Sequence, residues 1–233
     1  MNDIEPYLIW YICRHGKTTD NIQEIWTSQL DGKLDKEGED FAQTLLAQLI
    51  KLINPSIIYS SDLERAKSTA HLASEFAKYK KEIIYDKNLR EIYFGSLQNK
   101  TQNDIQALLT QKGLTQFNNL TYDDLRYMQV DSRAPFVNEF NAESINDIET
   151  RVNNVIENIK QKSGIIMSVA HGAINAYLVE YALHGTCGYN FYDNDKKFYL
   201  QDNTEVTILK FNQNGTLIKP AEVNIPISDV LIR

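Results

Sequence analysis

The feature that most constrains the fold of this chain is an apolar run near its start that ends abruptly in charged residues. Residues 7–13 read YLIWYIC, and such a run of β-branched, aromatic and aliphatic side chains is typical of a strand buried on both faces. The run stops at Arg14 and His15, which Gly16 follows. Because ligands of open α/β sheets bind outside the carboxyl ends of the strands, the Arg-His pair predicts a site and not a part of the core.

Strands and helices alternate along most of the remaining chain. Short apolar runs predict further strands, and apolar residues spaced three or four positions apart predict helices. The predicted strands cover residues 56–60, 83–85 and 165–170, and the predicted helices cover about 37–53, 62–78, 145–159 and 173–183. Residues 205–211 alternate like an edge or antiparallel strand, and the Asn214-Gly215 turn pairs them with a short strand near Leu217. This order predicts an α/β fold, a three-layer α/β/α sandwich with a mostly parallel central sheet.

Residues 95–141 interrupt the alternation. Their apolar periodicity is weak apart from a helix that ends near Leu109, so we expect an inserted lobe over the sheet edge. The chain, residues 1–233, is otherwise expected to form a single domain. Capping side chains are expected at three helix starts: Ser61 or Asp62, Thr101 with Asp104, and Glu143 with Ser144.

The composition fits one folded domain without a strongly charged macromolecular partner. Hydrophobic residues make up 42% of the 233 residues, which is enough for a full core, and the net charge of −7 argues against nucleic acid or an anionic membrane as a partner. Cys13 lies in the first predicted strand and Cys187 is the only other cysteine, so we expect no disulfide framework. The sequence has no basic leader and no apolar run of about 20 residues. We therefore expect a cytoplasmic protein.

Polar side chains follow three of the predicted strands. Arg14 and His15 follow the first strand, Arg65 lies just after the second, and His171 follows the strand at 165–170. Because the carboxyl ends of parallel strands meet at the same edge of a sheet, we expect these four side chains to converge.

Two guanidinium groups and two imidazoles around one point predict a pocket for an oxyanion such as a phosphoryl group. A planar guanidinium donates two hydrogen bonds at once to such oxygens. A neutral histidine can attack phosphorus and carry the group as phosphohistidine, so His15 is the candidate nucleophile. Glu91, after the strand at 83–85, is the candidate acid for the leaving oxygen. No residue pattern typical of a metal site occurs, so we expect neither a metal nor a cofactor.

Residues next to the histidines are expected to add to this site. Both histidines precede a glycine, and we expect Gly16 and Gly172 to open helices whose backbone N–H groups favour an anion. Lys17 adds a positive charge at the mouth. His71 and His184 are expected to be ordinary helix residues. Aromatic residues near the C-terminus are expected to pack in the core: Tyr189, Phe191, Tyr192, Phe198 and Tyr199.

Four sequence blocks at or after these strand ends occur in a characteristic order. They read CRHGKT at 13–18 with Asn21, SSDLERAKSTA at 60–70, LRE at 89–91 with Gly95, and AHG at 170–172. Together they resemble the histidine phosphatase superfamily, also called the phosphoglycerate mutase-like family, over roughly residues 7–95 and 145–211. The resemblance implies that His15 is the phosphorylated nucleophile and that Glu91 is the proton donor. It also implies phosphate contacts from Arg14, Asn21, Arg65 and His171.

Within that family the sequence favours hydrolysis. The resemblance implies a basic, proline-rich insertion in the cofactor-dependent mutases, whereas residues 95–141 hold few basic residues and one proline: Lys100, Lys112, Arg126, Arg133 and Pro135. We expect a metal-independent phosphomonoesterase that acts on a small phosphorylated metabolite. A cofactor-dependent phosphoglycerate mutase and a non-catalytic phospho-ligand binding protein on the same fold stay open as alternatives. Sugar phosphates, phosphoglycerates, nucleotides and cofactor-precursor phosphates are all candidate substrates.

Overall fold

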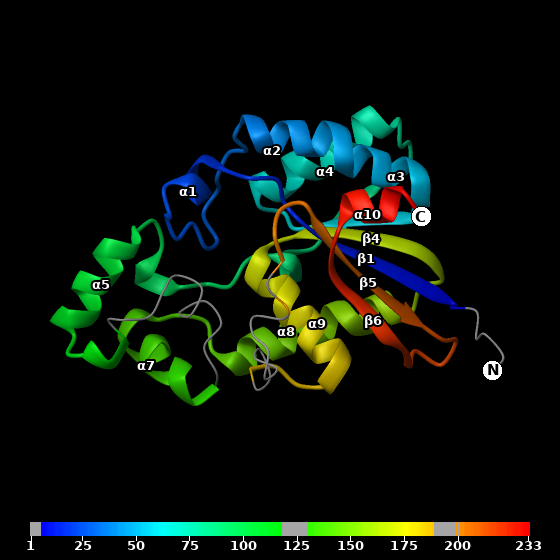
Figure 1. The fold of residues 1–233 in the computed structure, drawn as a ribbon. Coiled ribbons are helices and arrows are strands. Elements are labelled where there is room, and N and C mark those ends of the chain that lie inside the picture. The colour runs from blue at the N-terminus through cyan, green and yellow to red at the C-terminus, as the bar shows by residue number, and fades with distance from the viewer. Residues whose placement is uncertain (1–5, 118–129, 189–198, 200) are drawn as a thin grey trace.

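Six strands form one sheet in the described part of the computed structural model, and helices cover both of its faces (Figure 1). The structure describes residues 6–117, 130–188, 199 and 201–233. In spatial order the strands are β3 (Ile83–Tyr85), β2 (Ile57–Ser60), β4 (Gly164–Ala170), β1 (Leu8–Arg14), β5 (Glu205–Phe211) and β6 (Leu217–Pro226). The first four run parallel, and β5 and β6 are antiparallel to their neighbours. The predicted mostly parallel sheet is confirmed.

The strand register brings the carboxyl ends of three strands together. Arg14 at the end of β1 pairs with Ala170 at the end of β4, and Ser60 at the end of β2 pairs with Val169. The residues that follow these ends are His15, Ser61 and His171. The backbone continues the pairing for one step, because the His15 amide donates to the Ala170 carbonyl at 2.9 Å.

Different helices cover the two faces of the sheet (Figure 1). On one face, α8 (Ile145–Lys160) and α9 (Gly172–His184) pack over a core that contains the fully buried Trp10 and Leu209. On the other face the core contains Ile58 and Met167. The helices there are α2 (Lys36–Phe41), α3 (Ala47–Ile53), α4 (Glu64–Ala77) and α10 (Ile227–Leu231). This is the predicted three-layer sandwich, and its helices form because their apolar faces are buried against the sheet.

Two details of the helices differ from the sequence-based expectations. The helix expected over 37–53 is interrupted by a π-helical segment, Ala42–Leu46. Neither Ser61 nor Asp62 caps α4; Leu63 occupies the cap position without a side-chain bond. The Asp62 carboxylate instead accepts two hydrogen bonds from Arg90, and these bonds lower the pKa of Asp62.

The helix-start predictions for α5 (Gln102–Gln111) and α8 are confirmed. Thr101 with Asp104, and Ser144 with Asp147, form reciprocal capping boxes. The weak periodicity of residues 95–141 did not predict an additional helix, α7 (Val130–Phe140), which forms with Pro135 inside it. In Figure 1, α5 and α7 lie together to the side of the sheet. The weak turn signals at 118–119 and 122–124 lie outside the described residues.

The end of α7 lies close to Gly95. Gly95 has a φ of +58°, and a Cβ there would lie 1.8 Å from the Phe140 carbonyl oxygen. Only glycine satisfies both the left-handed backbone and this close approach.

The C-terminal hairpin is largely as expected. The Asn212 amide donates to the Thr216 carbonyl, and oxygens of Asn212 accept from the amides of Gly215 and Thr216. These bonds close the turn between β5 and β6, which pair as antiparallel strands. β5 lies inside the sheet, however, and β6 is the edge strand. Among the described residues, no helix combines the length and apolar character that crossing a membrane requires.

Candidate active site

The two histidines that follow β1 and β4 lie side by side. The ring centroids of His15 and His171 are 5.1 Å apart, and the side chains are 3% and 0% exposed. The predicted convergence of the strand ends is therefore observed. Most buried polar groups are hydrogen-bonded, so the partners of the ring nitrogens describe the site.

The hydrogen bonds of His15 fix its tautomer. Nδ1 lies 2.7 Å from the carbonyl oxygen of Gly16, and a carbonyl oxygen only accepts, so Nδ1 carries the proton. Nε2 accepts a hydrogen bond of 3.2 Å from Nε of Arg65, which only donates. His15 is therefore neutral, and the lone pair of Nε2 points toward Arg65.

Arg65 is buried and holds a loop as well as His15. It lies in the first turn of α4, and its terminal nitrogens donate to the carbonyls of Leu30 and Ser28, each at 2.7 Å. Its own carbonyl accepts from Thr69, whose hydroxyl in turn accepts from the Gly16 amide. The guanidinium is thus locked in one orientation beside Nε2 of His15.

His171 is hydrogen-bonded through Nε2. The Ser61 hydroxyl accepts from the Leu63 amide at 3.3 Å and forms a second hydrogen bond of 2.8 Å with Nε2 of His171. Burial, together with the positive charge of Arg65, holds the pKa of His171 well below its ordinary value. The neutral ring is therefore favoured, and a neutral imidazole carries one N–H donor.

The segment just before β5 holds the Arg14 side chain. One terminal nitrogen donates to the Gln201 carbonyl at 2.9 Å. The Gln201 side chain donates to the Ile12 carbonyl and accepts from Asn175, which also donates to the Cys13 carbonyl. This network ties the end of β1 to α9.

Two buried nitrogens at the carboxyl ends of β1 and β4, Nε of Arg14 and Nδ1 of His171, have no hydrogen-bond partner among the described residues. A buried N–H without a partner costs about 1–3 kcal/mol. A ligand that accepts hydrogen bonds from these two groups would remove this cost. With the guanidinium of Arg65, they can supply hydrogen bonds to several oxygens of one oxyanion.

Glu91 lies at the start of α9, next to His171. Its carboxylate accepts hydrogen bonds from the amides of Ile92, Ala173 and Ile174 at 3.0–3.3 Å. His171 occupies the cap position of α9 without a side-chain bond, so Glu91 supplies the acceptor that a capping side chain would provide. Glu91 is 7% exposed.

The remaining predicted site residues have structural partners. The helix expected to open at Gly16 is absent; a four-residue helix, α1 (Thr19–Ile22), begins later, and the Gly16 amide is bonded to Thr69 at 2.9 Å. Lys17 pairs with Glu37 at 2.7 Å. The Asn21 side-chain carbonyl accepts from the Thr18 amide in a capping box. Gly172, in contrast, opens α9 as expected.

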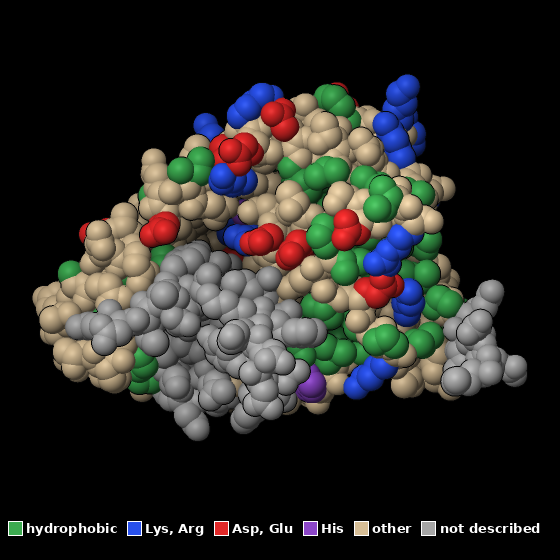
Figure 2. Space-filling view, in the orientation of Figure 1, with side chains coloured by type: hydrophobic (Ala, Val, Ile, Leu, Met, Phe, Trp, Pro, Cys, Tyr) green, Lys and Arg blue, Asp and Glu red, His purple; other side chains and the backbone are tan. Residues whose placement is uncertain are grey.

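Acidic and basic side chains of the described residues alternate on part of the surface (Figure 2). On the face shown in Figure 2, acidic and basic side chains lie next to one another. Close to the site, Arg90 pairs with Asp62 at 2.6 Å. No group of three or more histidine, cysteine or carboxylate side chains that could hold a metal ion occurs in the described ranges.

The other two histidines are on helices. His71 bonds the Tyr85 hydroxyl, and His184 bonds the Tyr199 hydroxyl at 3.0 Å. Tyr199 is buried, as expected. The other aromatic residues of that segment lie outside the described residues: Tyr189, Phe191, Tyr192 and Phe198.

The comparison with known families agrees with this arrangement. A family model described as the histidine phosphatase superfamily (branch 1) matches residues 10–223. The chain belongs to the histidine phosphatase superfamily. This match includes His15 and His171 and extends from within β1 to within β6.

The relatives of this chain are named as mutases, mutase-like proteins or phosphatases. "Phosphoglycerate mutase-like protein 4" of Arabidopsis thaliana is 29% identical over 174 residues, 73% of this chain and 69% of that protein. A "2,3-bisphosphoglycerate-dependent phosphoglycerate mutase" of Staphylococcus saprophyticus is 38% identical over 42% of this chain and 43% of its own length. A "Metal-independent phosphoserine phosphatase" of Arabidopsis thaliana is 36% identical over 37% of this chain and 36% of its own length.

Solved structures share the fold. "Bacillus stearothermophilus YhfR" superposes with a TM-score of 0.75 at 22% identity, covering 94% of this chain and 98% of that one. At this identity the likeness shows the fold alone. The superfamily fold thus extends over nearly the whole chain.

Sequence reasoning missed several residues that this superfamily member uses to hold its site. Ser61 was expected only as a helix cap, and Gln201 and Arg151 were not singled out, although each bonds a predicted site residue or its backbone. Ser61 had a signal, because it directly follows the end of β2. Gln201 and Arg151 had none, because their partners lie far away in the sequence.

Proposed function

We propose that this superfamily member is a metal-independent phosphomonoesterase that works through a phosphohistidine on His15. The observation that carries the proposal is the fixed tautomer of His15. Its Nε2 lone pair lies 3.2 Å from the Arg65 guanidinium, so a phosphoryl group bound by that guanidinium lies next to the nucleophile.

The proposed reaction has two steps. In the first, Nε of Arg65 shifts its hydrogen bond from Nε2 of His15 to a phosphoryl oxygen, and the freed lone pair of Nε2 attacks phosphorus in line. The bond from phosphorus to the ester oxygen breaks, and Glu91 in its protonated form gives its proton to the leaving oxygen. In the second, the Glu91 carboxylate takes a proton from water, whose oxygen attacks phosphorus and releases His15. Arg14, Arg65 and His171 hold the phosphoryl oxygens throughout, and Asn21 adds a contact at the mouth.

A cofactor-dependent phosphoglycerate mutase is the second candidate, supported by the Staphylococcus saprophyticus relative. Hydrolysis is favoured because the segment 95–141 carries few basic residues, and one of them, Lys112, is paired with Glu139 at 3.2 Å. A mutase must retain a bisphosphorylated intermediate, which requires additional cations. The hydrolytic route needs only one phosphoryl site.

Phosphate release from a panel of phosphate esters tests the proposal. We expect an aryl phosphate to be hydrolysed equally with and without EDTA, and His15→Ala to abolish the activity. Isomerisation of phosphoglycerates that depends on added bisphosphoglycerate, without phosphate release, would identify a mutase. Tight binding of phosphate without any turnover would instead identify a binding protein.

A further inference from the structure

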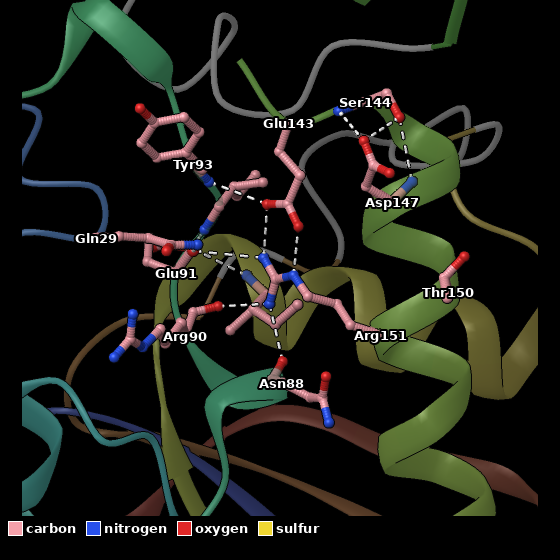
Figure 3. Close-up of polar contacts among 12 residues, drawn as sticks. Gln29, Asn88, Arg90, Glu91, Tyr93, Glu143, Ser144, Asp147, Thr150 and Arg151 are labelled. Atoms are coloured by element: carbon pink, nitrogen blue, oxygen red, sulfur yellow. Dashed lines mark hydrogen bonds and ion pairs between the residues drawn. The ribbon is translucent and has the colours of Figure 1, made fainter. Parts of the chain in front are cut away.

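A buried ion pair outside the predicted site holds the segment that carries Glu91 (Figure 3). Arg151 lies on α8 and Glu143 just before it, and their side chains are 12% and 11% exposed. Nε of Arg151 lies 2.5 Å from one carboxylate oxygen of Glu143, and a terminal nitrogen lies 2.8 Å from the other. This is a two-pronged pair with the geometry that a planar guanidinium favours.

The rest of the Arg151 guanidinium is directed at the backbone around Glu91. It donates to the carbonyls of Asn88 at 2.8 Å, Arg90 at 2.6 Å and Glu91 at 3.4 Å. Together with the two bonds to Glu143, these contacts use all five N–H donors that an arginine has. Figure 3 shows the guanidinium between α8 and this segment.

Glu143 fixes the same segment from its other side. Its carboxylate accepts from the Tyr93 amide at 3.0 Å, and its own amide donates to the Tyr93 carbonyl at 2.8 Å. The backbone on both sides of Glu91 is therefore held by one ion pair. The Glu91 carboxylate extends from this held segment to the amides of Ala173 and Ile174, two and three residues after His171.

We propose that Arg151, paired with Glu143, is a positioning residue that sets where the Glu91 carboxyl group lies beside the phosphoryl site. This inference rests on the proposed function, because it assigns Arg151 to the proton-transfer step. A lysine cannot replace it, since an ammonium group has three donors and no planar fork. Methionine has a similar length and no donors, so Arg151→Met removes the contacts with little change in volume.

Leaving groups of different basicity separate positioning from general support of the fold. An alkyl phosphate expels a basic alkoxide that needs the proton of Glu91, whereas an aryl phosphate with an electron-withdrawing ring needs it far less. We expect Arg151→Met and Glu91→Gln each to lower kcat/KM for the alkyl ester by about tenfold or more, and for the aryl ester by less than about threefold. Lys160→Met, which removes another basic side chain of α8, serves as the control and should change neither.

A double variant and a hydrogen-exchange measurement test the inference further. On the Glu91→Gln background, Arg151→Met should have no additional effect, because its effect passes through Glu91. Hydrogen exchange should be faster at the Ala173 and Ile174 amides in Arg151→Met, with the β4 amides unchanged. Equal losses on both esters, a further loss on the Glu91→Gln background, or unchanged exchange would each overturn the inference. If the wild-type protein shows no turnover, only the proposed function is wrong. The hydrogen-exchange measurement would still test whether Arg151 positions the Glu91 segment.

Discussion

Nε of Arg65 donates a hydrogen bond to Nε2 of His15 across 3.2 Å, although the two residues lie 50 positions apart in the chain. The same guanidinium ties down the loop at Ser28 and Leu30. One side chain therefore sets both the orientation of the proposed nucleophile and the position of the loop beside it.

Replacing Arg65 by lysine should impair turnover severely. Lysine keeps the charge but cannot reach His15 and both loop carbonyls from one planar group. We expect kcat/KM for an aryl phosphate to fall by about 100-fold or more. Steady-state kinetics of the variant measure this. The control is Lys67→Met, at a partly exposed position of the same helix. Activity within a few-fold of wild type would contradict the role of the fork.

Removing the Ser61 hydroxyl should weaken phosphate binding. In Ser61→Ala, buried Nε2 of His171 loses its hydrogen-bond partner, so the ring is less firmly held beside the phosphoryl site. We expect the inhibition constant of inorganic phosphate to rise by about 5- to 30-fold, which corresponds to about 1–2 kcal/mol. Ser56→Ala removes a hydroxyl at the opposite end of the sheet, where Ser56 donates to Ile165, and should leave this constant unchanged.

The buried, neutral His171 should make stability depend on pH. Its pKa is lowered in the folded protein, so below about pH 6.5 the unfolded chain takes up a proton that the folded chain excludes. The free energy of unfolding should therefore fall as the pH falls below that value, by up to about 1.4 kcal/mol per pH unit. Urea unfolding at pH 7.5 and 5.5 measures this. His171→Asn should lose this part of the pH dependence; an identical dependence in both proteins would contradict it.

Gly38→Ala should destabilise the protein, although alanine usually favours a helix. A Cβ at Gly38 in α2 would lie 2.1 Å from the Lys17 carbonyl oxygen, in the turn that follows His15. An ordinary helical glycine would give a gain of about 0.5–1 kcal/mol on this substitution. We expect a loss of about 1–3 kcal/mol instead, measured by urea unfolding, together with reduced turnover. A gain in stability would show that this close approach is not required.

The sequence was sufficient to predict the parts of the molecule that rest on local patterns. The apolar run before Arg14 and the run before His171 each form a strand because both are long enough and bounded by polar residues. Parallel pairing then brings their ends together without further information. The periodic apolar residues of α8 likewise form a helix that covers the sheet.

What could not be predicted depends on contacts between distant residues. Asp62 has the character of a helix cap, but its bonds to Arg90 take precedence over capping. Arg151 resembles any exposed helix residue in the sequence, and only the fold places it against the carbonyls near Glu91. The helix α7 forms despite Pro135, which local propensity disfavours.

The most direct test of the central claim is to trap the covalent intermediate. A labelled aryl phosphate is mixed with the protein, the reaction is stopped with strong base, and the labelled residue is identified by peptide mass spectrometry. We predict a base-stable, acid-labile phosphoryl group on His15 that is absent from His15→Ala and accumulates further in Glu91→Gln. Full turnover with no phosphoryl group on His15 at any time, or with the label on another residue, would contradict the account.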